Sequence, residues 1–267
     1  MRVVNGVVRV NGAAFDYVQF GGGEEQLVMI PGLGDGLTTV KGKALLGEVM
    51  FRPFTRDYRI TILSRKRVLE PHCTTESMAH DQAAAMRALG IQRAHIVGVS
   101  QGGMIAQHLA YEYPELVDRL VLVVTVPKTS ERLTEVCLRW KRLAQANRYK
   151  DLMIDLTELS HPEPYIRKAR KLYPFAGFGR PKSFTRFYLQ ANACMTHDAE
   201  KKLPFITAPT LIIGGGQDRV LGPEGSYALH EAIPGSRLHI YPQLGHALDE
   251  DAPDFPGRVM AFLQGLR

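Results

Sequence analysis

The stretch of sequence that decides the fold is Ala94-His95-Ile96-Val97-Gly98-Val99-Ser100-Gln101-Gly102-Gly103. Its first six residues form an apolar run of strand length, and a helical pattern begins at Gln101. A serine in a very tight turn between a strand and a helix projects clear of the backbone, and the residues two before and two after it come close together. Both are glycine here, Gly98 and Gly102. We therefore predict a nucleophile elbow with Ser100 as nucleophile; the alternative is an ordinary glycine-rich turn.

Apolar runs of strand length recur on both sides of this turn, at 27–30, 59–63, 120–124, 210–213 and 238–241. Helical patterns lie between or after them, at 75–89, 101–113, 225–232 and 254–266. Continuous apolar strands are expected where helices cover both faces of a parallel sheet. Near the N-terminus, two alternating segments meet at Asn11-Gly12, a hairpin signal. The sequence predicts an α/β fold with a mostly parallel eight-stranded sheet, an N-terminal antiparallel hairpin and helices on both faces.

One insertion interrupts this alternation of strands and helices. The segment 128–203 contains no convincing strand, and helical patterns cover 131–147, 149–159 and 166–173. Because the segment follows a sheet strand, we expect it over the carboxyl ends of the strands, where open α/β sheets bind their ligands. We predict a core formed by 1–127 and 204–267, and a helical cap, or lid, formed by 128–203.

A serine hydroxyl needs a base to become a nucleophile near neutral pH, and the base needs an orienting partner. Of the nine histidines, His246 follows the last predicted strand, on a loop that can reach over the sheet to Ser100. Asp218 follows the strand at 210–213, after three glycines; its alternative role is that of a turn residue capping the next helix. The chain order Ser100, Asp218, His246 is the order expected for nucleophile, acid and histidine.

The negative charge that develops on a substrate oxygen needs backbone donors. We expect the N–H of Gln101, at the start of a helix whose dipole favours negative charge, and the N–H of Leu33, in the loop 31–36. This glycine-rich loop does not fit a dinucleotide site, because a G-x-G-x-x-G motif from Gly32 would need glycine at Leu37. No spacing typical of a metal site occurs either. The sequence predicts neither a cofactor nor a metal.

The formal net charge of +6 is concentrated in the predicted cap. The segment 128–203 holds 16 Lys plus Arg and 8 Asp plus Glu, a balance of +8. One interpretation is a solvated helical surface, and a second is attraction of an anionic substrate by a basic cover. Nucleic-acid binding is not expected, because no stacking motif or recognition helix accompanies the charge. Aromatic cap residues are candidates for the pocket wall or for packing between cap helices: Trp140, Tyr165, Phe175, Phe178, Phe184, Phe187 and Tyr188.

The apolar runs, the N-terminal residues and the cysteines indicate the cellular compartment in which the protein acts. No apolar run approaches the roughly 20 residues that cross a bilayer, and the first twelve residues lack the apolar core of a secretory signal. Three cysteines, Cys73, Cys137 and Cys194, are an odd number without metal-like spacing, which favours reduced thiols. We expect a cytoplasmic protein that acts on a small molecule and does not insert into membranes.

Together these motifs resemble the α/β-hydrolase superfamily over essentially the whole chain. The resemblance rests on 98–103, 215–218 and 244–246 and on the helical insertion. Two stretches depart from the pattern: Pro31-Gly32 stands where such proteins usually have His-Gly, and Leu63-Ser64-Arg65-Lys66-Arg67 lacks the usual Asp-x-Arg-Gly.

The resemblance implies a serine hydrolase near the carboxylesterases and small capped lactonases, with an acyl-enzyme on Ser100 and the oxyanion on the N–H groups of Leu33 and Gln101. Serine at position 100 argues against the relatives that use aspartate there, the haloalkane dehalogenases and epoxide hydrolases. Alternatives on the same triad are hydrolysis of a carbon–carbon bond and thioesterase or acyltransferase activity. A non-catalytic binding protein on this fold is a further alternative, which a complete triad disfavours.

Overall fold

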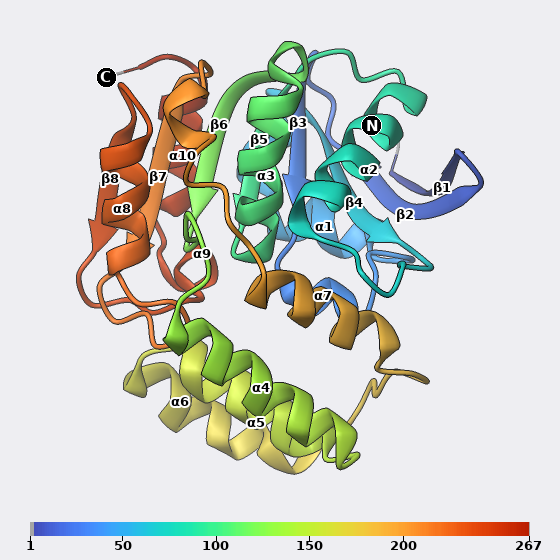
Figure 1. Ribbon diagram of the computed structural model, residues 1–267, viewed down its shortest axis with the longest axis vertical. Helices are drawn as coiled ribbons and strands as arrows, with labels where there is room; N and C mark the ends of the chain where they lie inside the picture. Colours follow the sequence, from blue (N-terminus) through green and yellow to red (C-terminus); the bar gives the residue numbers. More distant parts are fainter. Residues whose placement is uncertain (1–2, 267) are drawn as a thin grey trace.

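A single eight-stranded sheet runs through the computed structural model, which describes residues 3–266 (Figure 1). The strands are β1 (Val4–Val10), β2 (Ala13–Phe20), β3 (Glu25–Ile30), β4 (Tyr58–Lys66), β5 (Ala94–Val99), β6 (Val117–Val123), β7 (Thr210–Gly215) and β8 (Arg237–Tyr241). Their spatial order is β1-β2-β4-β3-β5-β6-β7-β8. The predicted fold class is confirmed; residues 1, 2 and 267, at the ends of the predicted core, lie outside the described part.

The first two strands form the hairpin that Asn11-Gly12 predicts. The pairing of β1 with β2 ends at Val10 and Ala13, and Asn11 and Gly12 have φ angles of 52° and 76°, as a type I′ turn requires. β2 also pairs antiparallel with β4, whereas the pairs from β4–β3 across to β7–β8 are parallel. The carboxyl ends of these parallel strands therefore meet at one edge of the sheet, where ligands bind in such folds.

Helices cover both faces of the sheet. One face packs against α2 (Thr75–Ala88), α3 (Gln101–Glu112) and α8 (Glu224–Ala232). The other packs against α1 (Ala44–Met50), α9 (Leu248–Asp251) and α10 (Phe255–Leu263). The four helices predicted from the sequence agree with α2, α3, α8 and α10 except at their ends, where assignments are least certain. α1 was not predicted, because several of its outward residues are apolar and blur the amphipathic pattern: Leu45, Leu46, Val49 and Met50.

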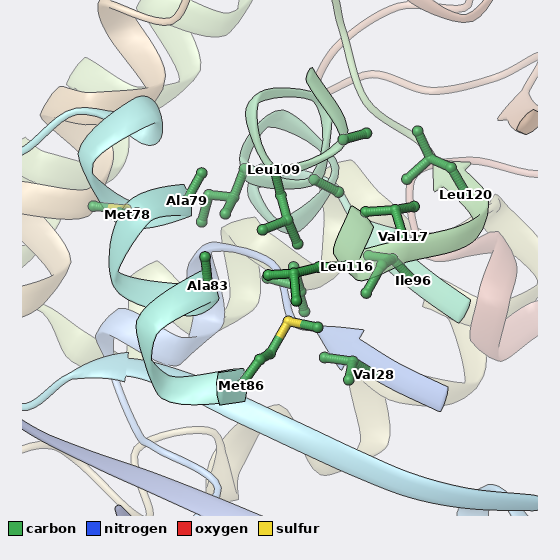
Figure 2. Packing of buried hydrophobic residues seen from close by; sticks show 14 of the residues in the cluster. Val28, Met78, Ala79, Ala83, Met86, Ile96, Leu109, Leu116, Val117 and Leu120 are labelled. Atoms are coloured by element: carbon green, nitrogen blue, oxygen red, sulfur yellow. The ribbon is translucent and has the colours of Figure 1, made fainter. Parts of the chain in front are cut away.

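The interface between α2, α3 and the sheet is a close-packed apolar core. Figure 2 shows Met86 of α2 pointing toward Val28 of β3, with Ile96 of β5 and Leu109 of α3 directed into the same region. All four side chains are completely buried. Each such burial contributes about 1.5–3 kcal/mol to folding, so this layer fixes α3, and with it the elbow at the start of α3, against the strands.

Between β6 and β7 the chain leaves the sheet and forms α4 (Glu131–Gln145), α5 (Tyr149–Ser160), α6 (Glu163–Ala169) and α7 (Thr185–Met195). α4, α5 and α6 lie together beyond the end of the sheet, and α7 lies between them and the strands (Figure 1). Val136 of α4, Leu152 of α5 and Phe187 of α7 belong to one apolar cluster. The same cluster includes residues that follow the sheet strands. This cluster packs the segment against the carboxyl ends of the strands.

Two details of this segment differ from the prediction. The helix expected at 166–173 begins earlier, at Glu163, because Pro164 occupies the first turn, where proline is tolerated. It continues as a 3₁₀ helix, Arg170–Phe175. α7 was not predicted, since its sequence includes aromatic and β-branched residues with modest helix propensity, and its helical state depends on packing.

We expect Ile96→Ala to lower the free energy of unfolding by about 2–5 kcal/mol, because it leaves a cavity beneath α3 where Ile96 is 0% exposed. Urea unfolding at equilibrium would measure the change. Val68→Ala is the matched control: Val68 is 81% exposed, so a change within about 0.5 kcal/mol is expected. Equal losses in both variants would contradict this account of the core.

Candidate active site

Three polar side chains meet at the carboxyl edge of the sheet. Ser100 follows β5, Asp218 follows β7 and His246 follows β8. The hydroxyl of Ser100 donates to Nε2 of His246 at 2.9 Å, and Nδ1 of His246 donates to Oδ2 of Asp218 at 2.7 Å. The structure therefore brings together the three residues that the sequence singled out, in a geometry that lets the imidazole take the proton of the hydroxyl.

The turn at Ser100 is strained. Its φ of 54° and ψ of −119° are a conformation that L-residues rarely adopt. A Cβ on Gly98 would lie 2.6 Å from the carbonyl oxygen of Gly102, and a Cβ on Gly102 would overlap the carbonyl oxygen of Ile30. The hydroxyl of Thr125 donates to the carbonyl oxygen of Ser100 at 2.9 Å. The two glycines let the turn close as predicted, and the surrounding contacts hold it there.

Asp218 is held by the backbone that follows it. Its Oδ1 accepts hydrogen bonds from the N–H groups of Val220 and Leu221 at 2.8 and 2.9 Å. The other carboxylate oxygen is thereby directed to His246, and the side chain is 3% exposed. The alternative role considered for Asp218 is capping of the next helix. Its bonds go instead to the turn at Val220 and Leu221, since the next helix, α8, begins at Glu224 with Pro223 as its N-cap residue.

The surroundings of His246 favour its protonated form. Burial lowers the pKa of His246, but the negative charge of Asp218 and the hydrogen bond to it raise this pKa more, and Asp249 adds to the rise. The net pKa lies above the ordinary value of 6.5. A histidine with a raised pKa is a stronger base toward the serine hydroxyl, and its charged form is stabilised as the proton arrives.

The two residues expected to supply oxyanion donors, Leu33 and Gln101, lie near Ser100. Leu33 begins a short 3₁₀ helix, Leu33–Gly36, after β3 and lines the same cavity as Ser100. A Cβ on Gly32 would lie only 3.3 Å from the Cβ of Ser100, so this loop passes directly against the nucleophile. Gln101 is the first residue of α3, where N–H groups have no partner within the helix. The role of the two N–H groups stays a prediction.

Arg65, in a stretch that departs from the family pattern, lies fully buried behind the elbow. Its Nη2 donates to Oε1 of Gln101 at 2.9 Å, and Nε2 of Gln101 donates to the carbonyl oxygen of Gln190 at 2.7 Å. Gln190 belongs to α7. The side chain of Gln101 therefore links a strand of the core to a helix of the inserted segment, next to its own backbone N–H.

Asp35, two residues after Leu33, is the centre of the same network. Its Oδ2 accepts from Nη2 of Arg186 at 2.8 Å, from the backbone N–H of Arg65 at 3.2 Å and from Nε2 of Gln190 at 3.3 Å. Since Arg186 and Gln190 are both on α7, this helix is fastened to the loop that carries Leu33. Sequence reasoning missed this network, for which its only signal was the unusual stretch around Arg65.

The cavity that contains Ser100 and His246 has a volume of about 630 Å³ and a mainly apolar wall. Its Phe, Tyr and Trp side chains are Phe51, Phe54, Trp140, Tyr165 and Phe255. Of the seven aromatic residues considered from the sequence, Trp140 and Tyr165 therefore line the cavity. The others pack with the cap cluster (Phe184, Phe187 and Tyr188) or are exposed (Phe175 and Phe178).

His161, which the sequence did not single out, also lines this cavity. Its Nδ1 lies 2.9 Å from Oδ2 of Asp251, and its ring stacks on Tyr165 with centroids 3.7 Å apart. Beside it, the carbonyl oxygen of Ser160 accepts from the N–H of Ala247 at 3.0 Å. The end of α5 thus contacts the loop that carries His246.

Three other histidines, His95, His108 and His197, are not part of the cavity wall. His108 in α3 and His197 are buried, and their rings meet edge to face with centroids 5.3 Å apart. Burial lowers the pKa of His108 to about 4 and the pKa of His197 to about 3. His95, inside β5, lies 3.2 Å from the carboxylate of Glu25. These contacts agree with a packing role for all three.

No cluster of three or more His, Cys, Asp or Glu side chains suited to a metal ion occurs within residues 3–266. In the same range, no helix has both the length and the apolar character needed to cross a membrane. The three cysteines, Cys73, Cys137 and Cys194, are buried free thiols.

Because the base must be neutral, we expect kcat/KM to fall on the acid side with an apparent pKa above 6.5. Asp218→Asn removes the charge that raises the pKa of His246, so the apparent pKa should move down and kcat should fall by about 10⁴-fold. pH profiles of the wild type and the variant would measure both. An unchanged acid limb in the variant would contradict the role of Asp218.

We expect Arg186→Met to lower the free energy of unfolding by about 3 kcal/mol, because it leaves the buried carboxylate of Asp35 without its guanidinium partner. Adding Asp35→Asn removes the unpaired charge, so the double variant should be more stable than the sum of the two single losses predicts. Thermal or urea unfolding of all three variants would test this. Strict additivity would show that the pair is not coupled.

Two solved structures share this fold over nearly the whole chain. An alpha/beta hydrolase enzyme, MGS-M2, from a Medee basin deep-sea metagenome library has a TM-score of 0.84 and 22% identity over 97% of both chains. The enol-lactonase from Burkholderia xenovorans LB400 has a TM-score of 0.81 and 20% identity, over 97% of this chain and 100% of that chain. At these identities the likeness concerns the fold.

In sequence, the chain is 29% identical over 277 aligned residues to the 2-hydroxy-6-oxononadienedioate/2-hydroxy-6-oxononatrienedioate hydrolase of a Pseudomonas species, covering 97% of this chain and 93% of that protein. Residues 52–253, most of the chain, match the family described as alpha/beta hydrolase fold. The matched range contains Ser100, Asp218 and His246. The chain therefore belongs to the alpha/beta hydrolase fold family and is a hydrolase of that family.

Proposed function

We propose that the protein is a serine hydrolase that cleaves a carboxylic ester, or a related acyl bond, of a small molecule through an acyl-enzyme on Ser100. The observation that carries this proposal is the hydrogen-bonded chain from Ser100 through His246 to Asp218, with distances of 2.9 and 2.7 Å. The mainly apolar cavity beside it suits the carbon skeleton of an ester.

Each group in this arrangement has a part in the proposed reaction. Oγ of Ser100 attacks the ester carbonyl while Nε2 of His246 takes its proton, and Asp218 stabilises the imidazolium that forms. The N–H groups of Leu33 and Gln101 stabilise the oxyanion. His246 then protonates the leaving alcohol, and afterwards activates a water molecule that hydrolyses the acyl-enzyme and frees Ser100.

We further propose that the segment 128–203 serves as a lid over the core formed by 1–127 and 204–267. The composition of the cavity wall supports this, because Trp140 and Met153 of α4 and α5 line it together with Ser100 and His246 of the core. α7 is fastened to the core by Arg186, and the end of α5 contacts the loop that carries His246 through Ser160, so these two helices are tied to the core at different places.

Hydrolysis of a carbon–carbon bond is the second candidate function. It is favoured by the 29% identity to the Pseudomonas hydrolase, whose name specifies dioate substrates. Dioates carry two carboxylates, however, and no Lys or Arg is among the described residues of the cavity wall. The wall therefore favours an ester substrate. Thioesterase and acyltransferase activities would use the same acyl-enzyme and stay as alternatives.

We also propose that the protein acts in the cytoplasm, on a small molecule and without a nucleic-acid partner. The buried free thiols of Cys73, Cys137 and Cys194 support a reducing compartment. The basic residues of the lid are not accompanied by any recognition motif for nucleic acid.

The test is covalent labelling of the intact protein with a fluorophosphonate, read by mass spectrometry. We expect one adduct per chain, on the peptide that contains Ser100, because only this serine is activated by His246. Ser100→Ala should abolish the adduct and lower kcat against an active ester by about 10⁴-fold or more. Ser160, the other serine of the cavity wall, serves as the internal control and should carry no label. Labelling that survives Ser100→Ala would contradict the proposal.

A further inference from the structure

The wall of the cavity that contains Ser100 and His246 includes two carboxylates. Asp249 and Glu250, three and four residues after His246, are part of its wall. The other titratable side chains of the wall are His161, Tyr165 and His246. No Lys or Arg belongs to the wall within the described range, so the +8 balance of the lid does not come into contact with a bound substrate.

Asp249 differs from the other half-buried and buried aspartates in having no partner. Asp16, Asp35 and Asp81 each pair with a Lys or Arg side chain, and Asp251 pairs with His161. Within residues 3–266, Asp249 forms no ion pair and no hydrogen bond to another residue's side chain; its carboxylate interacts with its own backbone N–H, and Asp249 is part of the cavity wall. A carboxylate that is partly withdrawn from water and left unpaired costs free energy, which a cationic ligand group would recover.

The aromatic residues of the same wall suit the same kind of ligand group. Phe51, Trp140 and Tyr165 line the cavity together with Asp249. Alkylammonium groups bind favourably against aromatic faces, and more so where water is excluded. An anionic group would instead meet two carboxylates and no Lys or Arg among the described residues of the wall.

We infer that the cavity selects acyl substrates that carry a quaternary or protonated amine, with Asp249 as the residue that pairs with the cation. The inference rests on the proposed function and specifies its substrate class. It assigns the opposite charge to the one suggested by the basic lid, whose Arg167, Lys168 and Lys171 are exposed to solvent.

Two pairs of esters that differ only in charge test the inference. Butyrylcholine is compared with 3,3-dimethylbutyl butyrate, and the p-nitrophenyl ester of 4-(trimethylammonio)butyrate with that of 5,5-dimethylhexanoate. The first pair carries the charge on the leaving group and the second on the acyl group. Ser100, His246 and the oxyanion donors act on both members of a pair. The ratio of their kcat/KM values, divided by the ratio of their rates of uncatalysed alkaline hydrolysis, therefore isolates the contribution of the charge to recognition. We expect a ratio of about tenfold or more in favour of the cation in at least one pair.

Asp249→Asn should bring this ratio close to one. Glu250→Gln is the matched control, since it removes the same charge one residue further on, at an exposed position where water and salt screen it. The ratio measured for Glu250→Gln should fall much less than the ratio measured for Asp249→Asn. Equal falls in the two variants would overturn the assignment to Asp249.

The pH dependence of the ratio is a second readout that a purely structural role of Asp249 would not move. Burial raises the pKa of Asp249 to about 6, Glu250 and Asp251 add to the rise, and His246 opposes it. The ratio should therefore increase as the pH rises through about 6 and Asp249 ionises. The protonation of His246 affects the hydrolysis of both esters equally, so its effect cancels in the ratio. His161 and Tyr165 are still present in the Asp249→Asn variant. If Asp249 causes the increase with pH, the increase should be absent in that variant.

The outcomes separate the inference from the proposed function. Hydrolysis of the neutral esters with ratios of one or less would contradict the inference alone. Hydrolysis of none of the four esters would contradict the proposed esterase activity, and the inference with it.

Discussion

The strained turn at Ser100 is the constraint on which the rest of the site depends. A φ of 54° at a serine exists only because glycine at 98 and 102 lets the backbone of the turn pass the end of β3. Val124, at the end of the neighbouring strand β6, has a φ of 42°, and the next residue, Thr125, holds the carbonyl oxygen of Ser100. Strain is thus stored at the ends of two adjacent strands and balanced by the packed layer of α2 and α3 behind them.

The parts of the molecule that follow from local rules could be predicted from the sequence. The elbow, the buried strands and the order of Ser100, Asp218 and His246 depend on hard sterics, on apolar runs and on loops at strand ends, all of which are visible over a few residues. Contacts between distant residues could not be predicted this way. Arg186 reaches Asp35 from 151 positions away, and nothing next to either residue signals the pair. Likewise, Asp249 stands in the acidic run 249–251, and only the fold shows that Asp249 is part of the cavity wall whereas Asp251 pairs with His161.

The net charge of the whole chain differs from the charge of the groups that line the cavity. The excess of Lys and Arg in 128–203 dominates the formal net charge, but much of it is exposed, where water and salt weaken its effect on the cavity. The half-buried carboxylate of Asp249 is part of the cavity wall, where the medium is less polar and its charge is less screened. A substrate in contact with the wall therefore experiences the field of a few nearby groups more strongly than the overall excess of positive charge.

The inserted helices are tied to the core to unequal extents. α7 shares hydrogen bonds with the loop that carries Leu33, with β4 and with the side chain of Gln101. A substitution on one side of these bonds therefore requires a matching change on the other side if the contacts are to survive. α6 has no such bond to the elbow or the loop that carries Leu33 among the described residues, yet its Tyr165 belongs to the cavity wall. Descendants of this chain could therefore acquire new substrates through substitutions in α6 while their bond-breaking chemistry stays the same.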